Sequence, residues 1–78
     1  MEKINVEIEA QKIEKAYKKY KSLLTPKQKE VITRYYGIDE QVRHTLFEIG
    51  KIYGVTRERI RQIKTEALIK LKIKSPNN

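Results

Sequence analysis

The segment 45–64 constrains the fold most, because it predicts two short helices joined by a tight turn. Thr45 and the glutamate three residues later form a capping box, which predicts the start of the first helix. Gly54 ends that helix, since glycine readily adopts the positive φ of a tight turn, and Thr56 caps the second. Gly50 leaves room where the two helices cross. The segment predicts a helix-turn-helix, with a plain helical hairpin as the alternative.

The apolar residues of this segment define the sides that we expect to be buried. The second helix is predicted from Arg57 to Lys72 or Lys74, with the buried stripe Ile60, Ile63, Ala67, Leu68 and Leu71. In the first helix we expect an inner face of Leu46, Ile49, Ile52 and Tyr53. Val55 is expected to fill the inside of the turn.

Two further helices are expected upstream. Residues 9–24 repeat apolar side chains at three- and four-residue steps, namely Ile13, Ala16, Tyr17, Tyr20, Leu23 and Leu24. We expect this stripe to pack on the chain's own core, with docking on another protein as the alternative. Residues 1–8 alternate apolar and polar types, which fits a short strand, a frayed helix start or no fixed structure.

The second upstream helix has strong signals at both ends. Its start is marked by Thr25 as a cap, Pro26 in the first helical position and Gln28 completing a capping box. Its apolar positions are Val31, Ile32, Tyr35 and Tyr36. Gly37 is expected to stop the helix in a left-handed conformation, so that Ile38 folds back onto it.

These elements predict an all-α fold, a small helical bundle of about four helices that contains the helix-turn-helix. We divide the chain into an N-terminal extension with an amphipathic helix at 1–22, a helix-turn-helix domain at 23–74 and a tail at 75–78.

Composition narrows the class of function. The net charge is +8, and residues 57–78 hold seven basic and two acidic residues, so the basic excess gathers on the second helix of the motif. A basic stripe on one helix is typical of nucleic-acid binding, and a solvated lysine-rich surface is the alternative. With no cysteine, one histidine (His44) and no glycine-rich phosphate loop, we expect neither an enzyme nor a metal site or cofactor. No apolar run is long enough for a membrane span or signal peptide, so we expect a cytoplasmic protein.

The outer face of the predicted second helix carries side chains suited to reading DNA bases. Arg57 and Arg61 can pair with guanine, Gln62 with adenine, and Glu58 can accept from cytosine. The free N–H groups of the helix start, beside Thr56, can hold a phosphate. A glutamate weakens non-specific phosphate binding, so its presence favours base reading or the orientation of an arginine. A surface Glu–Arg ion pair without function is the alternative.

The chain resembles region four of bacterial primary-type sigma factors. The resemblance lies in residues 24–39, in Thr-Leu-Phe-Glu-Ile-Gly at 45–50, in Gly-Val-Thr-Arg-Glu-Arg-Ile-Arg-Gln-Ile at 54–63 and in the Ala-Leu and Lys-Leu pairs of 67–71. It covers roughly residues 23–72. It implies a domain that recognises the −35 promoter element and docks on the flap of the RNA polymerase β subunit, in part through the helix 25–36. Anti-sigma and activator proteins are further partner classes of this family.

The resemblance also assigns site residues. The base-contacting residues would be Arg57, Glu58, Arg61 and Gln62. It would also place Lys27 and Thr56 near the DNA backbone, and we expect further contacts to the backbone from Thr45, Arg59 and Lys64. The chain departs from the family at four positions. The family usually has a basic residue where this chain has Tyr35, Glu66 and Ile69, and an acidic residue where it has Lys64.

The chain lacks the aromatic-rich parts of a sigma factor that open the −10 element, so we expect either an excised C-terminal domain or a small free-standing protein. Three functions follow. The first is a sequence-specific DNA-binding domain acting with RNA polymerase. The second is a protein-interaction module for the polymerase flap or an anti-sigma-like partner. The third is an independent dimeric regulator with residues 4–24 as its dimer contact.

Overall fold

The computed structural model describes residues 6–39 and 42–72 of the chain. It contains the helices α1 (Val6–Tyr20), α2 (Pro26–Tyr36), α3 (Leu46–Tyr53) and α4 (Arg57–Lys70), with a short 3₁₀ turn η1 (Lys21–Leu23) between α1 and α2. The described residues include no strand, which confirms the predicted all-α class.

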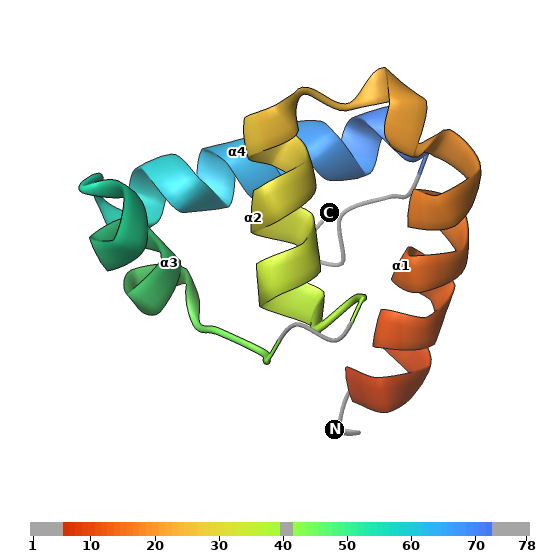
Figure 1. The fold of residues 1–78 in the computed structure, drawn as a ribbon, viewed down its shortest axis with the longest axis horizontal. Coiled ribbons are helices and arrows are strands. Elements are labelled where there is room, and N and C mark those ends of the chain that lie inside the picture. The colour runs from red at the N-terminus through yellow and green to blue at the C-terminus, as the bar shows by residue number, and fades with distance from the viewer. Residues whose placement is uncertain (1–5, 40–41, 73–78) are drawn as a thin grey trace, which may run out of the picture.

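Helix α4 organises the bundle, because it packs against both α2 and α3. Figure 1 shows α1 and α2 running alongside each other, with α4 crossing α2. The start of α4 lies beside α3 at one end of the molecule, and its last turn lies near η1 and α1 at the other. The helix-turn-helix therefore sits at the end of the molecule away from α1.

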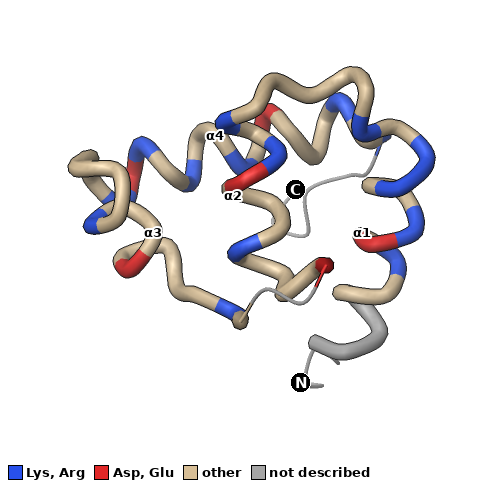
Figure 2. Tube along the Cα trace, in the orientation of Figure 1, with Lys and Arg blue, Asp and Glu red and all other residues tan. Residues whose placement is uncertain are grey.

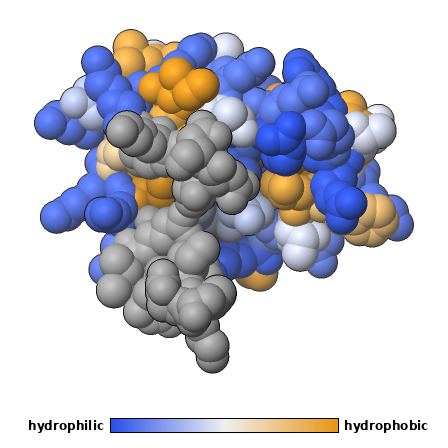
Figure 3. Space-filling view, turned by 180° about the vertical axis from the view of Figure 1, so that it is seen from behind, coloured by the Kyte–Doolittle hydropathy of each residue, from blue (hydrophilic) through white to orange (hydrophobic). Residues whose placement is uncertain are grey.

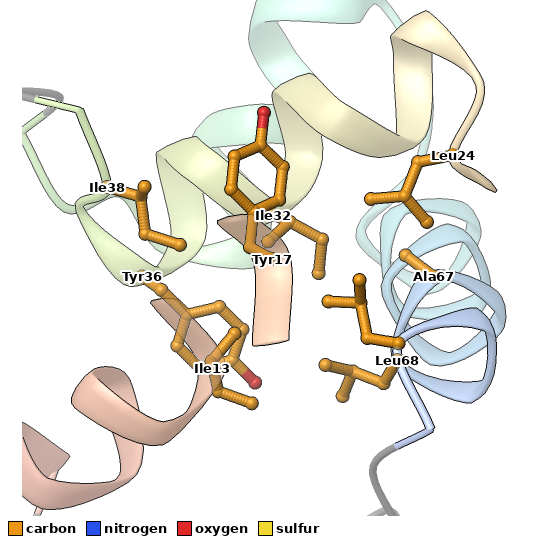
Figure 4. Close-up of a cluster of buried hydrophobic side chains, with 9 residues drawn as sticks. Ile13, Tyr17, Leu24, Ile32, Tyr36, Ile38, Ala67 and Leu68 are labelled. Atoms are coloured by element: carbon orange, nitrogen blue, oxygen red, sulfur yellow. The ribbon is translucent and has the colours of Figure 1, made fainter. Parts of the chain in front are cut away.

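The larger hydrophobic cluster joins α1 to α2 and the second half of α4. Figure 4 shows Ile13 and Tyr17 of α1 facing Ile32 of α2 and Leu68 of α4. Ile13 and Tyr17 are buried, so the apolar stripe of α1 packs on the chain's own core, as the sequence predicted. Tyr36, Ile38, Ala67 and Leu71 complete this cluster together with Leu24.

A second cluster fixes the helix-turn-helix to α2. It consists of Val31 of α2, Ile49 of α3, and Ile60 and Ile63 of α4, which are all buried. Because these four side chains come from three helices, the position of α3 and of the first half of α4 is set by α2. The predicted buried stripe of α4 is confirmed in full.

The predicted signals at the ends of α2 are confirmed. Thr25 and Gln28 form both hydrogen bonds of a capping box, and Pro26 is the first helical residue. Gly37 has a φ of 68°, and Ile38 folds back to 1% exposure. These contacts fix where the chain leaves α2 and keep its last turn closed over the core.

Helix α1 begins and ends earlier in the chain than the predicted range of 9–24. It begins at Val6 within a stretch compatible with a strand, and it ends at Tyr20, after which η1 turns the chain. Leu23 therefore leaves the apolar stripe and is 51% exposed. The uncertain residues 1–5 lie outside the described part of the chain.

Two expectations for the motif were wrong. Ile52 is 48% exposed and Val55 is 38% exposed, whereas both were expected inside. The reason is that α3 has only eight residues and touches its neighbours along a narrow strip at Ile49 and Gly50. The turn brings its backbone, rather than the Val55 side chain, against Gly50.

The surface behind the bundle is mostly hydrophilic, with hydrophobic side chains showing as separate patches (Figure 3). Within the described residues, no helix combines the length and the apolar character that crossing a bilayer requires.

Candidate nucleic-acid interface

The helix-turn-helix geometry is built by local capping chemistry. Thr45 and Glu48 form a complete capping box at the start of α3. The turn is made at Gly54, whose φ of 71° suits glycine. Thr56 then accepts a hydrogen bond from the backbone N–H of Arg59 at 3.1 Å and so caps α4. The sequence predicted all three signals, and each is confirmed.

Gly50 permits the close approach of α3 and the turn. A Cβ atom at this position would lie 2.7 Å from the carbonyl oxygen of Val55 and 3.3 Å from the carbonyl carbon of Thr56. Both atoms belong to the backbone, so they cannot swing aside as a side chain would. The prediction of a small residue at the crossing is confirmed, and the contact is with the turn that leads into α4.

The outer face of α4 presents the predicted base-contacting residues to solvent. Arg57, Glu58, Arg61 and Gln62 are all exposed. Ile60 and Ile63 point the opposite way into the second cluster, and this fixes the rotation of the helix. Figure 2 shows basic and acidic residues along α4, which runs across the molecule. The helix therefore offers a polar, mainly basic ridge beside α3.

Glu58 and Arg61 form a two-point ion pair on this ridge. Arg61 donates from Nε to one carboxylate oxygen at 3.0 Å and from Nη2 to the other at 2.5 Å. The hydrogen bond from Arg61 is the main reason why the pKa of Glu58 lies below its usual value. The same hydrogen bond raises the pKa of Arg61. The pair keeps both side chains charged and holds the guanidinium plane in one orientation.

Arg59 and Gln62 form a second pair, in which Arg59 Nη1 donates to Gln62 Oε1 at 3.4 Å. Both side chains are exposed. This bond uses the amide oxygen of Gln62 and not the NH₂ group, which can act as a donor. The sequence contains a signal for this pair, because side chains three residues apart on a helix are neighbours, but the pair was not predicted.

The predicted backbone-contacting residues lie on three helices. Thr45 and Thr56 are exposed at the starts of α3 and α4, where free N–H groups favour an anion. Lys27 lies in the first turn of α2, with its Nζ 4.8 Å from the centre of the Tyr53 ring. Lys64 lies on α4, with its Nζ 4.8 Å from the centre of the Tyr35 ring.

A polar cluster between α2 and α3 was missed by sequence reasoning. The hydroxyl of Tyr53 donates to the Glu30 carboxylate. Arg34 lies beside both groups, with its Nε 4.0 Å from a Glu30 oxygen. Burial is the main reason why the pKa of Tyr53 is raised, and the bond to Glu30 raises it further. The sequence does contain one signal for this cluster: the inner face of α3 carries Tyr53 rather than a phenylalanine, and a buried tyrosine hydroxyl usually has a hydrogen-bond partner.

Gln28 has a second role that was also missed. Its side-chain oxygen accepts from the backbone N–H of Thr25 at 3.0 Å and from Lys70 Nζ at 3.1 Å. The capping box of α2 is thereby tied to the last turn of α4. Nothing local in the sequence predicts this link, because residues 28 and 70 meet only through the fold.

No group of three or more His, Cys, Asp or Glu side chains that could hold a metal ion occurs in the part of the chain that the structure describes. His44 lies in the connection between α2 and α3, and its Nδ1 donates to the Val42 carbonyl at 2.7 Å.

Comparison with known proteins places this geometry in a family. The family model for sigma-70, region 4, matches residues 22–72. RNA polymerase sigma factor SigA1 of Synechococcus elongatus is 46% identical over 57 residues, covering 73% of this chain and 14% of the relative. RNA polymerase sigma factor RpoD of Neisseria gonorrhoeae is 51% identical over 49 residues, covering 63% of this chain and 8% of the relative.

The probable RNA polymerase sigma-C factor of Synechocystis is 49% identical over 49 residues, covering 63% of this chain and 12% of that protein. The chain thus spans a small part of the length of each of these relatives. The family match begins within η1, after the end of α1, and extends through the whole helix-turn-helix. On this match the chain belongs to the sigma-70 region 4 family.

Proposed function

We propose that this chain is a sequence-specific DNA-binding domain that recognises a −35-like promoter element and acts with RNA polymerase in transcription initiation or its regulation. The observation that carries the proposal is the exposed outer face of α4, with Arg57, Glu58, Arg61 and Gln62 on the second helix of a helix-turn-helix. The relatives are RNA polymerase sigma factors by name, which supports the same assignment.

In this proposal α4 enters the major groove, and its polar face reads the base edges. Arg57 and Arg61 donate to guanine, and the amide of Gln62 pairs with adenine. Glu58 either accepts from cytosine or orients Arg61, with which it already forms an ion pair. The buried Ile60 and Ile63 fix the rotation of α4, so its two arginines and one glutamine face outward together, and these side-chain types favour particular bases over phosphates in general.

The DNA backbone is proposed to contact Lys27, Thr45, Thr56, Arg59 and Lys64. Two of these residues, Thr45 and Thr56, cap helices whose first N–H groups can bind a phosphate. Lys27 and Lys64 supply positive charge from α2 and α4, on either side of the second core cluster. Such contacts fix the orientation of the protein and carry most of the salt dependence of binding.

Docking on the β-subunit flap is proposed from the family, with α2 as part of the surface. In the cell this assigns the chain to the cytoplasm, where RNA polymerase acts. Anti-sigma-like and activator proteins are candidate partners on the same ground. A pull-down with an isolated β flap tests the docking, and an absence of binding at micromolar concentration would contradict it.

One observation behind the two alternative functions no longer supports them. Both the interaction module and the dimeric regulator drew on an open apolar stripe in the first 24 residues. Ile13 and Tyr17 are buried against the chain's own core, and Leu24 joins them there. Sedimentation at high concentration should therefore show a monomer.

Fluorescence anisotropy with two duplexes tests DNA recognition. A duplex with a TTGACA-like element should bind at least about tenfold more tightly than a scrambled duplex of the same composition. Arg57→Ala should remove much of that difference, since one base-reading arginine is worth about 1–3 kcal/mol. Arg43→Ala removes the same charge from an exposed connection and serves as the matched control. Equal binding of both duplexes by the unaltered chain would refute sequence-specific recognition.

A further inference from the structure

Two lysines assigned above to the DNA backbone are each held against an aromatic ring of a different helix. Lys27 of α2 places its Nζ 4.8 Å from the centre of the Tyr53 ring of α3. Lys64 of α4 places its Nζ 4.8 Å from the centre of the Tyr35 ring of α2. Both distances lie within the range in which an ammonium group is attracted to a ring face.

Both rings are fixed by the fold. Tyr35 is half-buried, packs against both core clusters and meets Tyr36 edge-to-face, with ring centres 4.9 Å apart. Tyr53 is half-buried against the second cluster, and its hydroxyl donates to Glu30. A ring with so little freedom gives the lysine above it a defined place.

The other lysine–aromatic contacts in the described residues either use an exposed ring or lie at the end of the molecule that holds α1. Those at that end join Lys19 and Lys72 to Tyr20, and Lys21 to Tyr17. Lys51 lies 5.3 Å from the ring of Phe47 on its own helix, but Phe47 is 58% exposed. Lys19 lies 5.4 Å from the ring of its neighbour Tyr20, on α1 at the far end of the molecule. Neither contact combines a ring from another helix with a place beside the helix-turn-helix.

We propose that Tyr35 and Tyr53 are positioning residues for DNA binding, which hold the ammonium groups of Lys64 and Lys27 where phosphates pass. The inference rests on the proposed function. A lysine held over a ring face keeps its positive charge, and this charge is what attracts a phosphate. A lysine that is already placed also gives up less side-chain freedom when DNA binds.

The readout is the absolute value of the slope of log K against log salt concentration for the promoter duplex, called the slope below, because it counts the phosphates that are neutralised. Lys27→Gln and Lys64→Gln should each lower the slope by about 0.9. Tyr35→Met and Tyr53→Met keep apolar bulk but remove the ring, and each should lower the slope by a similar amount. Tyr35→Phe and Tyr53→Phe keep the ring and should retain the slope of the unaltered chain.

A double substitution separates positioning from a general loss of structure. Lys64→Gln combined with Tyr35→Met should lower the slope no further than either change alone, because both remove the same phosphate contact. Tyr20→Met removes a half-buried ring that also contacts lysines and should leave the slope unchanged. Helical circular dichroism of every variant identifies those that fold.

A measurement on the free protein keeps the test decisive if a methionine variant does not fold. Nuclear magnetic resonance should show the ε-CH₂ protons of Lys64 shifted upfield by the ring current, in the unaltered chain and in Tyr35→Phe. An unshifted signal, or a slope unchanged or increased by Tyr35→Met, would overturn the positioning role. If the unaltered chain does not distinguish the two duplexes, the proposed function itself fails, which is a different result.

Discussion

Glu58 and Arg61 are joined on the outer face of α4 by two parallel hydrogen bonds, Nε to Oε1 at 3.0 Å and Nη2 to Oε2 at 2.5 Å. Both side chains are exposed, so their ion pair contributes little to stability. Its effect is on geometry, because two bonds fix the plane of the guanidinium group before any partner arrives. A fixed arginine suits recognition of one base better than attraction to any phosphate.

Glu58→Gln should therefore change specificity more than stability. Loss of the carboxylate frees Arg61 and adds net positive charge to the ridge, so binding to a scrambled duplex should tighten. The preference for a TTGACA-like duplex should fall by about threefold or more, while the free energy of unfolding stays close to that of the unaltered chain. Anisotropy at fixed salt measures both duplexes. Glu66→Gln makes the same charge change at another exposed position of α4 and should preserve the preference.

The same pair predicts an unusual titration. The hydrogen bond from Arg61 lowers the pKa of Glu58, so its carboxylate should stay ionised to a lower pH than an ordinary glutamate. A depressed pKa in the folded state gives a contribution that is present above the unfolded pKa and lost as the pH falls through the folded one. Titration of the carboxyl carbon by nuclear magnetic resonance should show this, and Arg61→Ala should restore the usual range. If the pKa of Glu58 stays depressed in that variant, Arg61 does not cause the shift.

Gly50→Ala should destabilise the chain, although alanine is the better helix former. In an open helix this change stabilises by about 1 kcal/mol. In α3 the new Cβ would lie 2.7 Å from the Val55 carbonyl oxygen, which is backbone and has to move. Overpacking of this kind costs about 1–3 kcal/mol, so a net loss is expected. Urea denaturation measures it, with Lys51→Ala on an exposed site of the same helix as control. Equal or greater stability would show that the turn relaxes easily.

The ends of the helices were predictable from the sequence because capping is local chemistry. Thr25 with Gln28, and Thr45 with Glu48, each satisfy free backbone groups only three residues away. Gly54 marks its turn because positive φ strains other residues. No long-range information is needed for any of these signals, and all of them appear in the structure.

The sequence does not predict which apolar residues at the edge of a helix face are buried, because this depends on how much of the helix its neighbours cover. Ile52 is as apolar as Ile49, yet only Ile49 is buried, because neighbours cover a narrow part of the eight-residue α3. Leu23 leaves its stripe because η1 changes the direction of the chain. The helical period of the apolar residues in α4 was enough to predict which residues of the candidate site are exposed. The contact of Lys64 with Tyr35 could not be predicted in this way, because it depends on how α4 packs on α2.

Gln28→Ala should cost more than an ordinary capping substitution. Its side-chain oxygen closes the capping box at Thr25 and also accepts from Lys70 Nζ at 3.1 Å, at a site where Gln28 is 7% exposed. With about 1 kcal/mol for each hydrogen bond, we expect a loss of about 1.5–2 kcal/mol in the free energy of unfolding. Lys70→Met breaks only the second link and should cost less than half as much. Equal costs would mean that the capping bond contributes nothing.

The hydroxyl of Tyr53 should make stability fall at high pH. Burial, and then its hydrogen bond to Glu30, raise the pKa of this group above its ordinary value of about 10. The folded state therefore binds the proton more tightly than the unfolded state. The resulting stability is complete below the unfolded pKa and is lost as the pH rises through the folded one.

Tyr53→Phe isolates this contribution, since every other titratable group is present in both proteins and cancels in the difference. Below about pH 9 the unaltered chain should be more stable by roughly 1 kcal/mol, the value of one hydrogen bond. As the pH rises above about 10, that advantage should shrink, because the ionised phenol would face the Glu30 carboxylate. Urea denaturation at a series of pH values on both sides of about 10 measures the difference. An advantage that stays constant as the pH rises would show that Glu30 and burial do not control the ionisation of Tyr53.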